Sequence, residues 1–260
     1  MLSALLVLGV AAAQVGWLPG AAALGASRPG VGAFGSSGPR PPEDLSGVPL
    51  GAPMPAPAGG GTHQFVGLQD DEVSPVAYDP CRPIHYVIRP DNAPLAGDRL
   101  LDDALFRLSQ VTGMQFVYDG ATDEGPTGDR ESFQLDRYGD RWAPVLISWD
   151  TVTENADLAG DVAGMAGSAA ASVGDGPEIL VSGVVELDAL QFDELLTRPD
   201  GFQVARAVLL HELGHLLGLG HVSDPTQLMY PKGQPGVTDF AAGDLTGLAA
   251  LGAGACEPAL

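Results

Sequence analysis

Positive charge is scarce in this sequence. Of its 260 residues only 12 are Lys or Arg, against 33 Asp or Glu, and the formal net charge at pH 7 is −21. A protein that binds the phosphate backbone of nucleic acid needs a basic surface that displaces counterions. The composition therefore argues against a nucleic-acid partner, while the 45% of hydrophobic residues is enough for a folded core.

Cysteine is also rare. Cys81 and Cys256 are the only two in the chain. In an exported protein such a pair predicts one disulfide, which would close a very long loop and stabilise the fold by about 4 to 5 kcal/mol in the chain-entropy model. The alternative is two free, buried thiols.

Charged side chains are absent from residues 1–27. An apolar run, LLVLGVAAAQVGWL, is followed by Ala21 and Ala23 in a small-x-small cleavage pattern. Residues 1–26 are therefore interpreted as a signal peptide, which predicts a secreted, extracellular protein. Because the run is not preceded by Lys or Arg, an uncleaved anchor that holds the protein on the outer side of a membrane is the alternative.

Residues 27–74 have little hydrophobic periodicity. They are dense in Gly, Pro, Ala and Ser, which predicts a flexible linker or a short pro-segment. The folded domain is expected over residues 75–260.

Hydrophobic patterning divides this domain into strands and helices. Strands are expected at 84–89, 114–120, 143–150 and 178–190, a polar loop before the third of them, and helices at 91–113, 200–218 and 241–252. Asp200 is a plausible N-cap of the second helix, and Gly218 ends it. Because strands precede the helix that carries the histidines, the fold class is α+β or α/β, and α+β is the one we expect.

Three of the five histidines lie in one stretch of eleven residues, HELGHLLGLGH. His211 and His215 are four residues apart, so a helix places both imidazoles on one face. Gly218 can adopt the left-handed conformation that ends the helix, which lets His221 return toward the same point. Three neutral imidazoles suit Zn²⁺ and leave a fourth position open to water, as in catalytic zinc sites.

Glu212 follows the first of these histidines. It would project beside the metal, where it can act as the general base that takes a proton from water and returns it to a leaving amine. The stretch therefore predicts a zinc-dependent endopeptidase that acts on protein or peptide substrates. Two alternatives are ordinary helix residues and a non-catalytic zinc-containing module that binds peptides or proteins at the cell surface.

The stretch matches the pattern H-E-x-x-H-x-x-G-x-x-H and resembles the metzincin metalloproteases. Met229 lies in Leu228-Met229-Tyr230-Pro231, which looks like the Met-turn of the matrixins. The resemblance covers about residues 80–252. It implies a metzincin-like zincin fold: a twisted mixed sheet, a long first helix, an active-site helix, and a C-terminal helix after the Met-turn.

The resemblance also implies roles for two further features. Asp244 matches an Asp that braces the Met-turn, its alternative being a solvated carboxylate at a helix N-terminus. Residues 161–172 would form the edge strand over the cleft, where a substrate adds as an extended strand. A Gly/Ala linker is the alternative for that segment.

The sequence departs from the matrixins in its other histidines and cysteines. Matrixins hold a second, structural zinc, but only His63 and His85 remain here, so a single catalytic zinc is expected, with His85 a strand residue and His63 a linker residue. The Cys that caps the zinc in the family's pro-segment is missing from residues 24–80. Calcium binding by acidic residues is an alternative, although a solvated acidic loop is favoured. The protein is expected to be a monomer. The candidate calcium ligands are Asp119, Asp123, Glu124 and Asp129.

Overall fold

The computed structural model describes residues 44–128 and 130–260. The segment interpreted as a signal peptide or anchor, residues 1–26, lies outside the described residues. Within the described part of the chain, no helix has both the length and the apolar character needed to cross a membrane.

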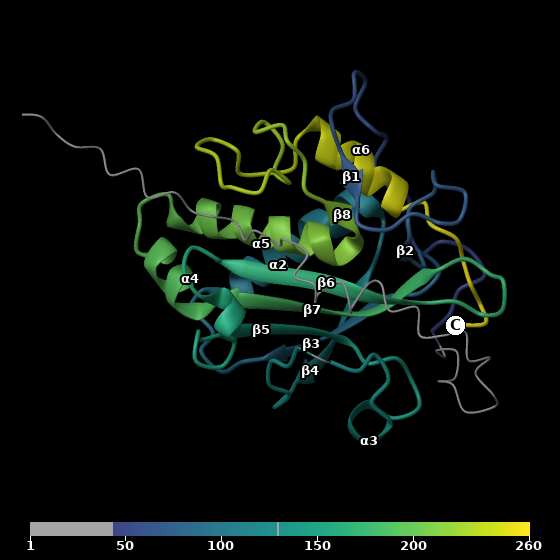
Figure 1. Cartoon of the computed structure of the whole chain (residues 1–260), viewed down its shortest axis with the longest axis horizontal. Coiled ribbons are helices and arrows are strands. Elements are labelled where there is room, and N and C mark those ends of the chain that lie inside the picture. The colour runs from purple at the N-terminus through teal and green to yellow at the C-terminus, as the bar shows by residue number, and fades with distance from the viewer. Residues whose placement is uncertain (1–43, 129) are drawn as a thin grey trace, which may run out of the picture.

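Six strands form one mixed sheet (Figure 1). They are β2 (Ala77–Tyr78), β3 (Ile84–Arg89), β4 (Phe116–Ala121), β5 (Val145–Asp150), β6 (Gly164–Ala171) and β7 (Ile179–Asp188). The order β2-β7-β5-β3-β4 is parallel throughout, and β6 pairs antiparallel with β7. Because β5 and β6 occupy opposite sides of β7, β6 is an edge strand. The mixed sheet and its edge strand agree with the prediction.

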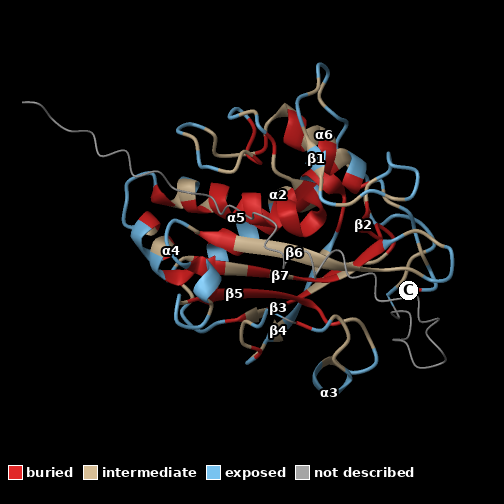
Figure 2. Ribbon diagram, in the orientation of Figure 1, coloured by how far each residue is buried: buried red, intermediate tan, exposed pale blue. Residues whose placement is uncertain are grey.

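The structure has three longer helices: α2 (Gly97–Thr112), α5 (Gly201–Leu217) and α6 (Ala242–Leu251). α2 and α5 pack on the sheet, and α6 packs on these two helices and lies beside β1 and β8 (Figure 1). All three were expected from the hydrophobic pattern. The apolar stripe of α2 is buried, and this helix ends at Gly113 as predicted. Figure 2 shows buried residues concentrated in α5 and along the central strands, so the core lies between the sheet and these helices.

The end of β7 differs from the expectation. The predicted strand 178–190 stops at Asp188, and α4 (Ala189–Leu196) begins at once. The Asp188 carboxylate accepts the N–H of Gln191 at 2.9 Å, which satisfies the start of the helix. Two shorter helical segments also lie in regions expected to be irregular: α3 (Leu135–Tyr138) and a 3₁₀ turn, η1 (Ala156–Leu158).

The start of α5 also differs from the expectation. Asp200 does occupy the N-cap position, but its side chain makes no capping hydrogen bond. Its carboxylate lies 3.4 Å from the guanidinium of Arg198 instead.

Residues 44–74 pack on the domain, which differs from the expectation of a flexible linker. Three backbone N–H groups donate to the domain: Ser46 to Cys81 O (2.7 Å), Leu50 to Pro80 O (2.9 Å) and Met54 to Val111 O (2.9 Å). Hydrophobic periodicity missed this segment because backbone hydrogen bonds hold it. Whether it acts as a pro-segment stays a prediction.

The N-terminal segment also contributes a strand. β1 (Gln64–Phe65) pairs antiparallel with β8 (Leu219–Gly220), the strand that follows α5. The predicted disulfide Cys81–Cys256 is present and joins the start of the domain to its C-terminal end.

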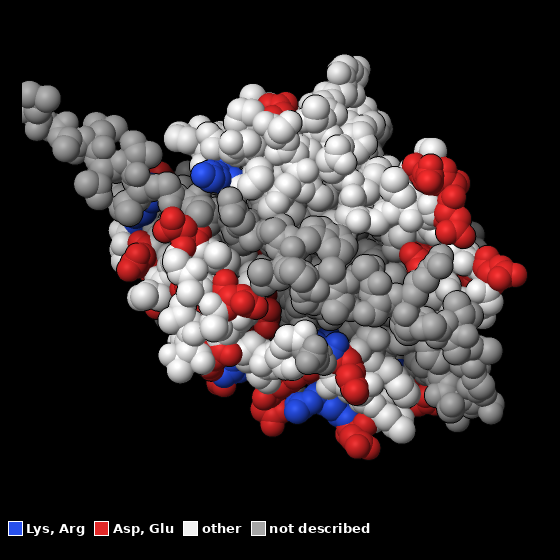
Figure 3. All heavy atoms as spheres, in the orientation of Figure 1, with Lys and Arg blue, Asp and Glu red and all other residues white. Residues whose placement is uncertain are grey.

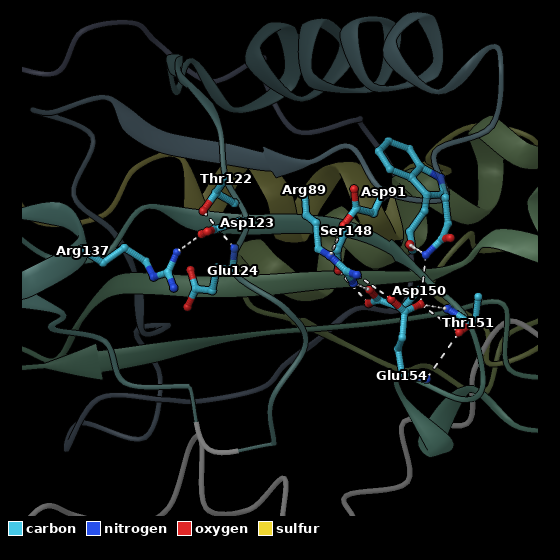
Figure 4. A network of polar contacts seen from close by, with 12 residues as sticks. Arg89, Asp91, Thr122, Asp123, Glu124, Arg137, Ser148, Asp150, Thr151 and Glu154 are labelled. Carbon is cyan, nitrogen blue, oxygen red and sulfur yellow. Dashed lines mark hydrogen bonds and ion pairs between the residues drawn. The ribbon is translucent and has the colours of Figure 1, made fainter.

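Ion pairs fasten loops at the ends of β3 and β5. Arg89 donates to Asp150 (2.9 Å) and Glu154 (2.5 Å), and Glu154 also accepts from the Thr151 N–H (2.9 Å) (Figure 4). Asp150 is fully buried, and it also accepts the hydroxyl proton of Ser148 at 2.7 Å. These contacts hold the loop after β5, which leads to the edge strand β6.

Candidate metal centre

Three imidazoles converge where α5 ends. His211 and His215 lie on the buried face of α5, and Gly218 ends the helix in the left-handed region, with φ 113°. The chain then returns through β8, so that His221 faces the other two. The three Nε2 atoms lie 3.1 Å from one another.

The protons of two of these rings are fixed by backbone carbonyls. His211 Nδ1 lies 2.7 Å from Leu228 O, and His215 Nδ1 lies 2.7 Å from Leu219 O. A carbonyl can only accept, so Nδ1 carries the proton in both rings and Nε2 presents a lone pair. The 3.1 Å contact between the Nε2 atoms of His211 and His215 therefore joins two acceptors and is not a hydrogen bond. Two lone pairs directed at one point, with His221 Nε2 3.1 Å from each nitrogen, suit a cation.

Burial keeps these histidines neutral. It lowers the pKa of His211 to about 4 and lowers the pKa of His215 well below its usual value. It also lowers the pKa of His221, which is half-buried. Neutral imidazoles are the form that binds metals, so all three can act as ligands at neutral pH.

The donor set and its spacing fit zinc. A triangle with edges of 3.1 Å has its centre about 1.8 Å from each corner. One ion could therefore contact all three Nε2 atoms at the usual Zn–N distance of about 2.0–2.1 Å. His215 and His221 also line a cavity of about 670 Å³, which leaves the remaining side of such an ion open. These features suit a zinc site with three protein ligands and an open position.

Glu212 lies beside the histidines and is fully buried. Neither carboxylate oxygen has a hydrogen-bond partner, and burial raises the pKa of Glu212 to about 8. Its side chain packs against Gly164 at the start of β6, where an added Cβ would lie 2.8 Å from Glu212 Cγ. A buried carboxyl group without partners is costly. A cation in the adjacent site would compensate and would lower this pKa.

The predicted Met-turn packs against the histidine helix, where an added Cβ at Gly214 would lie 2.7 Å from Met229 Sδ. Met229 is buried, and its carbonyl accepts the Val222 N–H at 3.1 Å, just after His221. Asp244, at the start of α6, accepts the N–H groups of Leu228 (2.7 Å) and Met229 (3.3 Å). Because Leu228 O orients His211, Asp244 supports the metal centre through the turn. This position agrees with the bracing role that the resemblance implies.

Asp244 also serves the helix in which it lies. Its carboxylate accepts the Ala241 N–H at 2.9 Å, at the N-terminus of α6. Burial raises the pKa of Asp244, although its three backbone donors oppose this effect. Asp244 does lie at the N-terminus of α6, but it is fully buried, so the alternative of a solvated carboxylate is wrong.

Three of the four carboxylates considered for calcium contact a cationic side chain. Arg141 contacts Asp119 at 2.6 Å, Arg137 contacts Asp123, and Arg130 contacts Glu124 at 2.9 Å. The fourth candidate, Asp129, lies outside the described residues. Within residues 44–128 and 130–260, the groups able to gather around one ion are the three histidines and Asp79 with the two disulfide-bonded cysteines.

The two remaining histidines lie apart from the metal centre. His85 is in β3, as expected, and its ring nitrogens lie 2.7 Å from carboxylate oxygens of Asp119 and Asp44. His63 precedes β1 and packs on Phe65, with the ring centroids 5.3 Å apart.

Residues 133–251 match the model of the Matrixin family, Peptidase_M10. This match supports a matrixin-like metzincin catalytic domain in the chain. The matched region of this domain includes the edge strand, the histidine helix, the Met-turn and α6. The family is one of metalloproteases that normally bind zinc. A comparison with curated proteins gave no match.

One wall of the cavity beside the histidines was missed in the sequence. It contains Phe65 and Val66, which belong to the segment interpreted as a linker. Glu186, in β7, also lines this cavity and was not singled out. Local patterning carries no signal for these positions, because the segments meet only in the folded domain.

Proposed function

We propose that this protein is a secreted zinc endopeptidase. In this proposal His211, His215 and His221 hold one zinc ion, and Glu212 is the general base. The observation that carries the proposal is the buried, unpartnered carboxylate of Glu212 beside three converging Nε2 atoms. A purely structural site would not leave a carboxylate in this state.

The chemistry divides between the metal and the protein. Zinc, when bound, supplies a Lewis acid that lowers the pKa of water and polarises the substrate carbonyl. Glu212 takes the proton from the attacking water and passes it to the nitrogen of the departing amine. The carbonyls of Leu228 and Leu219 hold two of the ligand rings in the required tautomer.

The edge strand supports a peptide substrate. β6 lines the cavity at the histidines, and its outer edge pairs with no other strand among the described residues. An extended peptide can add to such an edge through main-chain hydrogen bonds. The small side chains of β6 leave space for the side chains of that peptide.

Secretion is part of the proposal and has two supports. The sequence pattern of residues 1–26 is typical of a signal peptide, and the disulfide Cys81–Cys256 is typical of an oxidising compartment.

Figure 3 shows carboxylates over much of the margin of one face and few basic groups, which agrees with a protein or peptide partner rather than nucleic acid.

The test compares the purified protein with Glu212→Ala, using an unfolded protein and quenched peptides as substrates. We expect the wild type to cleave and Glu212→Ala to be slower by about 10²- to 10⁴-fold while it still binds one zinc ion per chain. Glu194→Ala, which removes an exposed glutamate of α4, is the matched control and should retain full activity. A chelator should abolish cleavage, and added zinc should restore it.

Two results would overturn the proposal. Bound zinc without cleavage by the wild type would favour the alternative of a non-catalytic peptide-binding module. Elemental analysis that finds no stoichiometric metal in the native protein would contradict both functions.

A further inference from the structure

The cavity beside the metal centre lies between two walls that are far apart in the sequence. One wall is the edge strand β6, from Met165 to Ala170, and the other is built from Thr62, residues 64–67 and Gly220 of β8. Figure 1 shows β1 and β8 on the side of β6 that also carries α5 and α6. The segment that precedes the matrixin-like domain therefore borders the cleft.

This N-terminal wall is fastened to the metal centre by its backbone. Gln64 pairs with Gly220, Phe65 pairs with Leu219, and the Val66 N–H donates to Gly218 O at 2.8 Å. Leu219 O is also the acceptor that orients His215. The wall is thus held at a fixed position relative to the histidine ligands.

The side chains of this wall divide into a support and a contact surface. Phe65 is half-buried and packs on the core, so it holds the wall in place. Val66 lines the cavity with 45% of its surface exposed, which is high for an apolar side chain in an ordered strand region. Val76 and Leu180 extend the apolar surface beside it. The face around β1 and α6 is mainly uncharged in Figure 3.

The position of Glu212 indicates in which direction a substrate peptide would run along the cleft. Glu212 packs against Gly164, the first residue of β6, whereas the cavity extends along Ala166 to Ala170. A peptide paired antiparallel with β6, the slightly more stable arrangement, would run from the Ala170 end toward Gly164. Its residues before the scissile bond would then lie between β6 and Val66.

We propose that residues 64–67 form a specificity wall in which Val66 contacts an apolar side chain of the substrate on the amino-terminal side of the scissile bond. This inference rests on the proposed peptidase function and names which part of the substrate is selected and by what chemistry. The occupant is the extended substrate peptide, because the cavity continues from the zinc ligands along an unpaired strand edge. Val66 is a specificity residue, and Phe65 positions it.

The test replaces the apolar side chain of Val66 with a charged one. Val66→Asp is compared with Val73→Asp, a matched control in the same segment whose side chain is 76% exposed and does not line the cavity. Quenched peptides vary one residue at a time on each side of the scissile bond. For Val66→Asp we expect kcat/KM to fall at least about tenfold for Leu or Phe before the bond and to rise for Lys or Arg there, since one apolar contact changes selectivity by about 10- to 200-fold. Preferences after the bond should stay as in the wild type.

A binding measurement separates this inference from the proposed catalysis. In a Glu212→Gln background, fluorescence anisotropy with the same peptides should show the same exchange of preference between Leu and Lys, with the zinc content unchanged. If the wild type cleaves nothing, the peptidase proposal fails, while the binding comparison still decides whether Val66 selects the peptide. An equal loss for all peptides, a change also caused by Val73→Asp, or the absence of binding by every peptide would overturn the specificity wall.

Discussion

Two buried glutamates of this protein lie in opposite environments. The carboxylate of Glu124 accepts two hydrogen bonds from Arg130 (2.9 and 3.0 Å), one from Tyr138 (2.6 Å) and one from Gln134 (2.7 Å). Burial is the largest influence on the pKa of Glu124 and raises it, yet these hydrogen bonds together bring the pKa below its usual value. Glu212 has no such donors, and its pKa rises to about 8.

This difference distinguishes a buried carboxylate that stabilises the fold from one that is available for chemistry. Glu124 and Arg130 close a network that also reaches Ser182 on β7 and the carbonyl of Pro144, so the pair fastens the segments around these two residues to the sheet. Glu212 stays unsatisfied within the protein, beside the three histidines. A buried polar group without a partner requires an explanation, and a proton-transfer role next to a metal provides one.

The largest expected effect on stability comes from replacing each of the two carboxyl groups, one at a time, with an amide. Glu124→Gln should lower the free energy of unfolding by about 3 to 5 kcal/mol, because it leaves the Arg130 guanidinium buried without its counter-charge. Glu212→Gln in metal-free protein at pH 7 should leave stability unchanged or raise it, since Glu212 is then mostly protonated. Urea unfolding of both variants measures these changes. An equal loss in the free energy of unfolding would contradict the distinction between the two glutamates.

A smaller effect is expected from the carboxylate under the metal centre. Asp244→Ala removes the acceptor of three backbone N–H groups and should cost about 1 to 3 kcal/mol of stability. It should also weaken zinc binding by about 10- to 100-fold, because it loosens the turn that orients His211. Unfolding and zinc titration measure the two effects.

The matched control is Asp200→Ala. Asp200 also lies at a helix N-terminus but makes no capping hydrogen bond, so we expect little change in either measurement. A comparable loss of zinc affinity in both variants would show that Asp244 does not act through the Met-turn.

The smallest effect concerns pH. The hydrogen bond from Arg89 and contacts with Thr151 lower the pKa of Glu154 to about 2. Between this value and the unfolded value near 4.5, the unfolded chain binds more protons, so the stabilisation is full above about pH 4.5 and is lost as the pH falls to 2. Because Glu154 is exposed, Glu154→Gln should cost only about 1 kcal/mol at pH 6.

Unfolding curves at several pH values test this expectation. The difference between wild type and Glu154→Gln should disappear near pH 2, and the other two carboxylates that face Arg89, Asp150 and Asp91, are present in both proteins. Glu131→Gln, at another exposed glutamate, should parallel the wild type throughout. A difference that persists at pH 2 would mean that the charge of Glu154 is not what stabilises the loop.

Much of the metal centre follows from local geometry. The offset of four between His211 and His215 places both on one helix face, and Gly218 supplies the left-handed residue that turns the chain toward His221. Helix periodicity and backbone sterics act over a few residues, so the sequence by itself determined this stretch, the α2 stripe and most strand positions.

Other features arose only from tertiary contacts. The pairing of β1 with β8 joins Phe65 to Leu219, and the Arg130–Glu124 pair is completed by Ser182. Nor does the sequence reveal that Val66 borders the zinc ligands, because residues 44–74 are held by backbone hydrogen bonds that carry no side-chain pattern. Local propensity determined which segments become helices and strands, whereas long-range hydrogen bonding and burial decided which of them enclose the site.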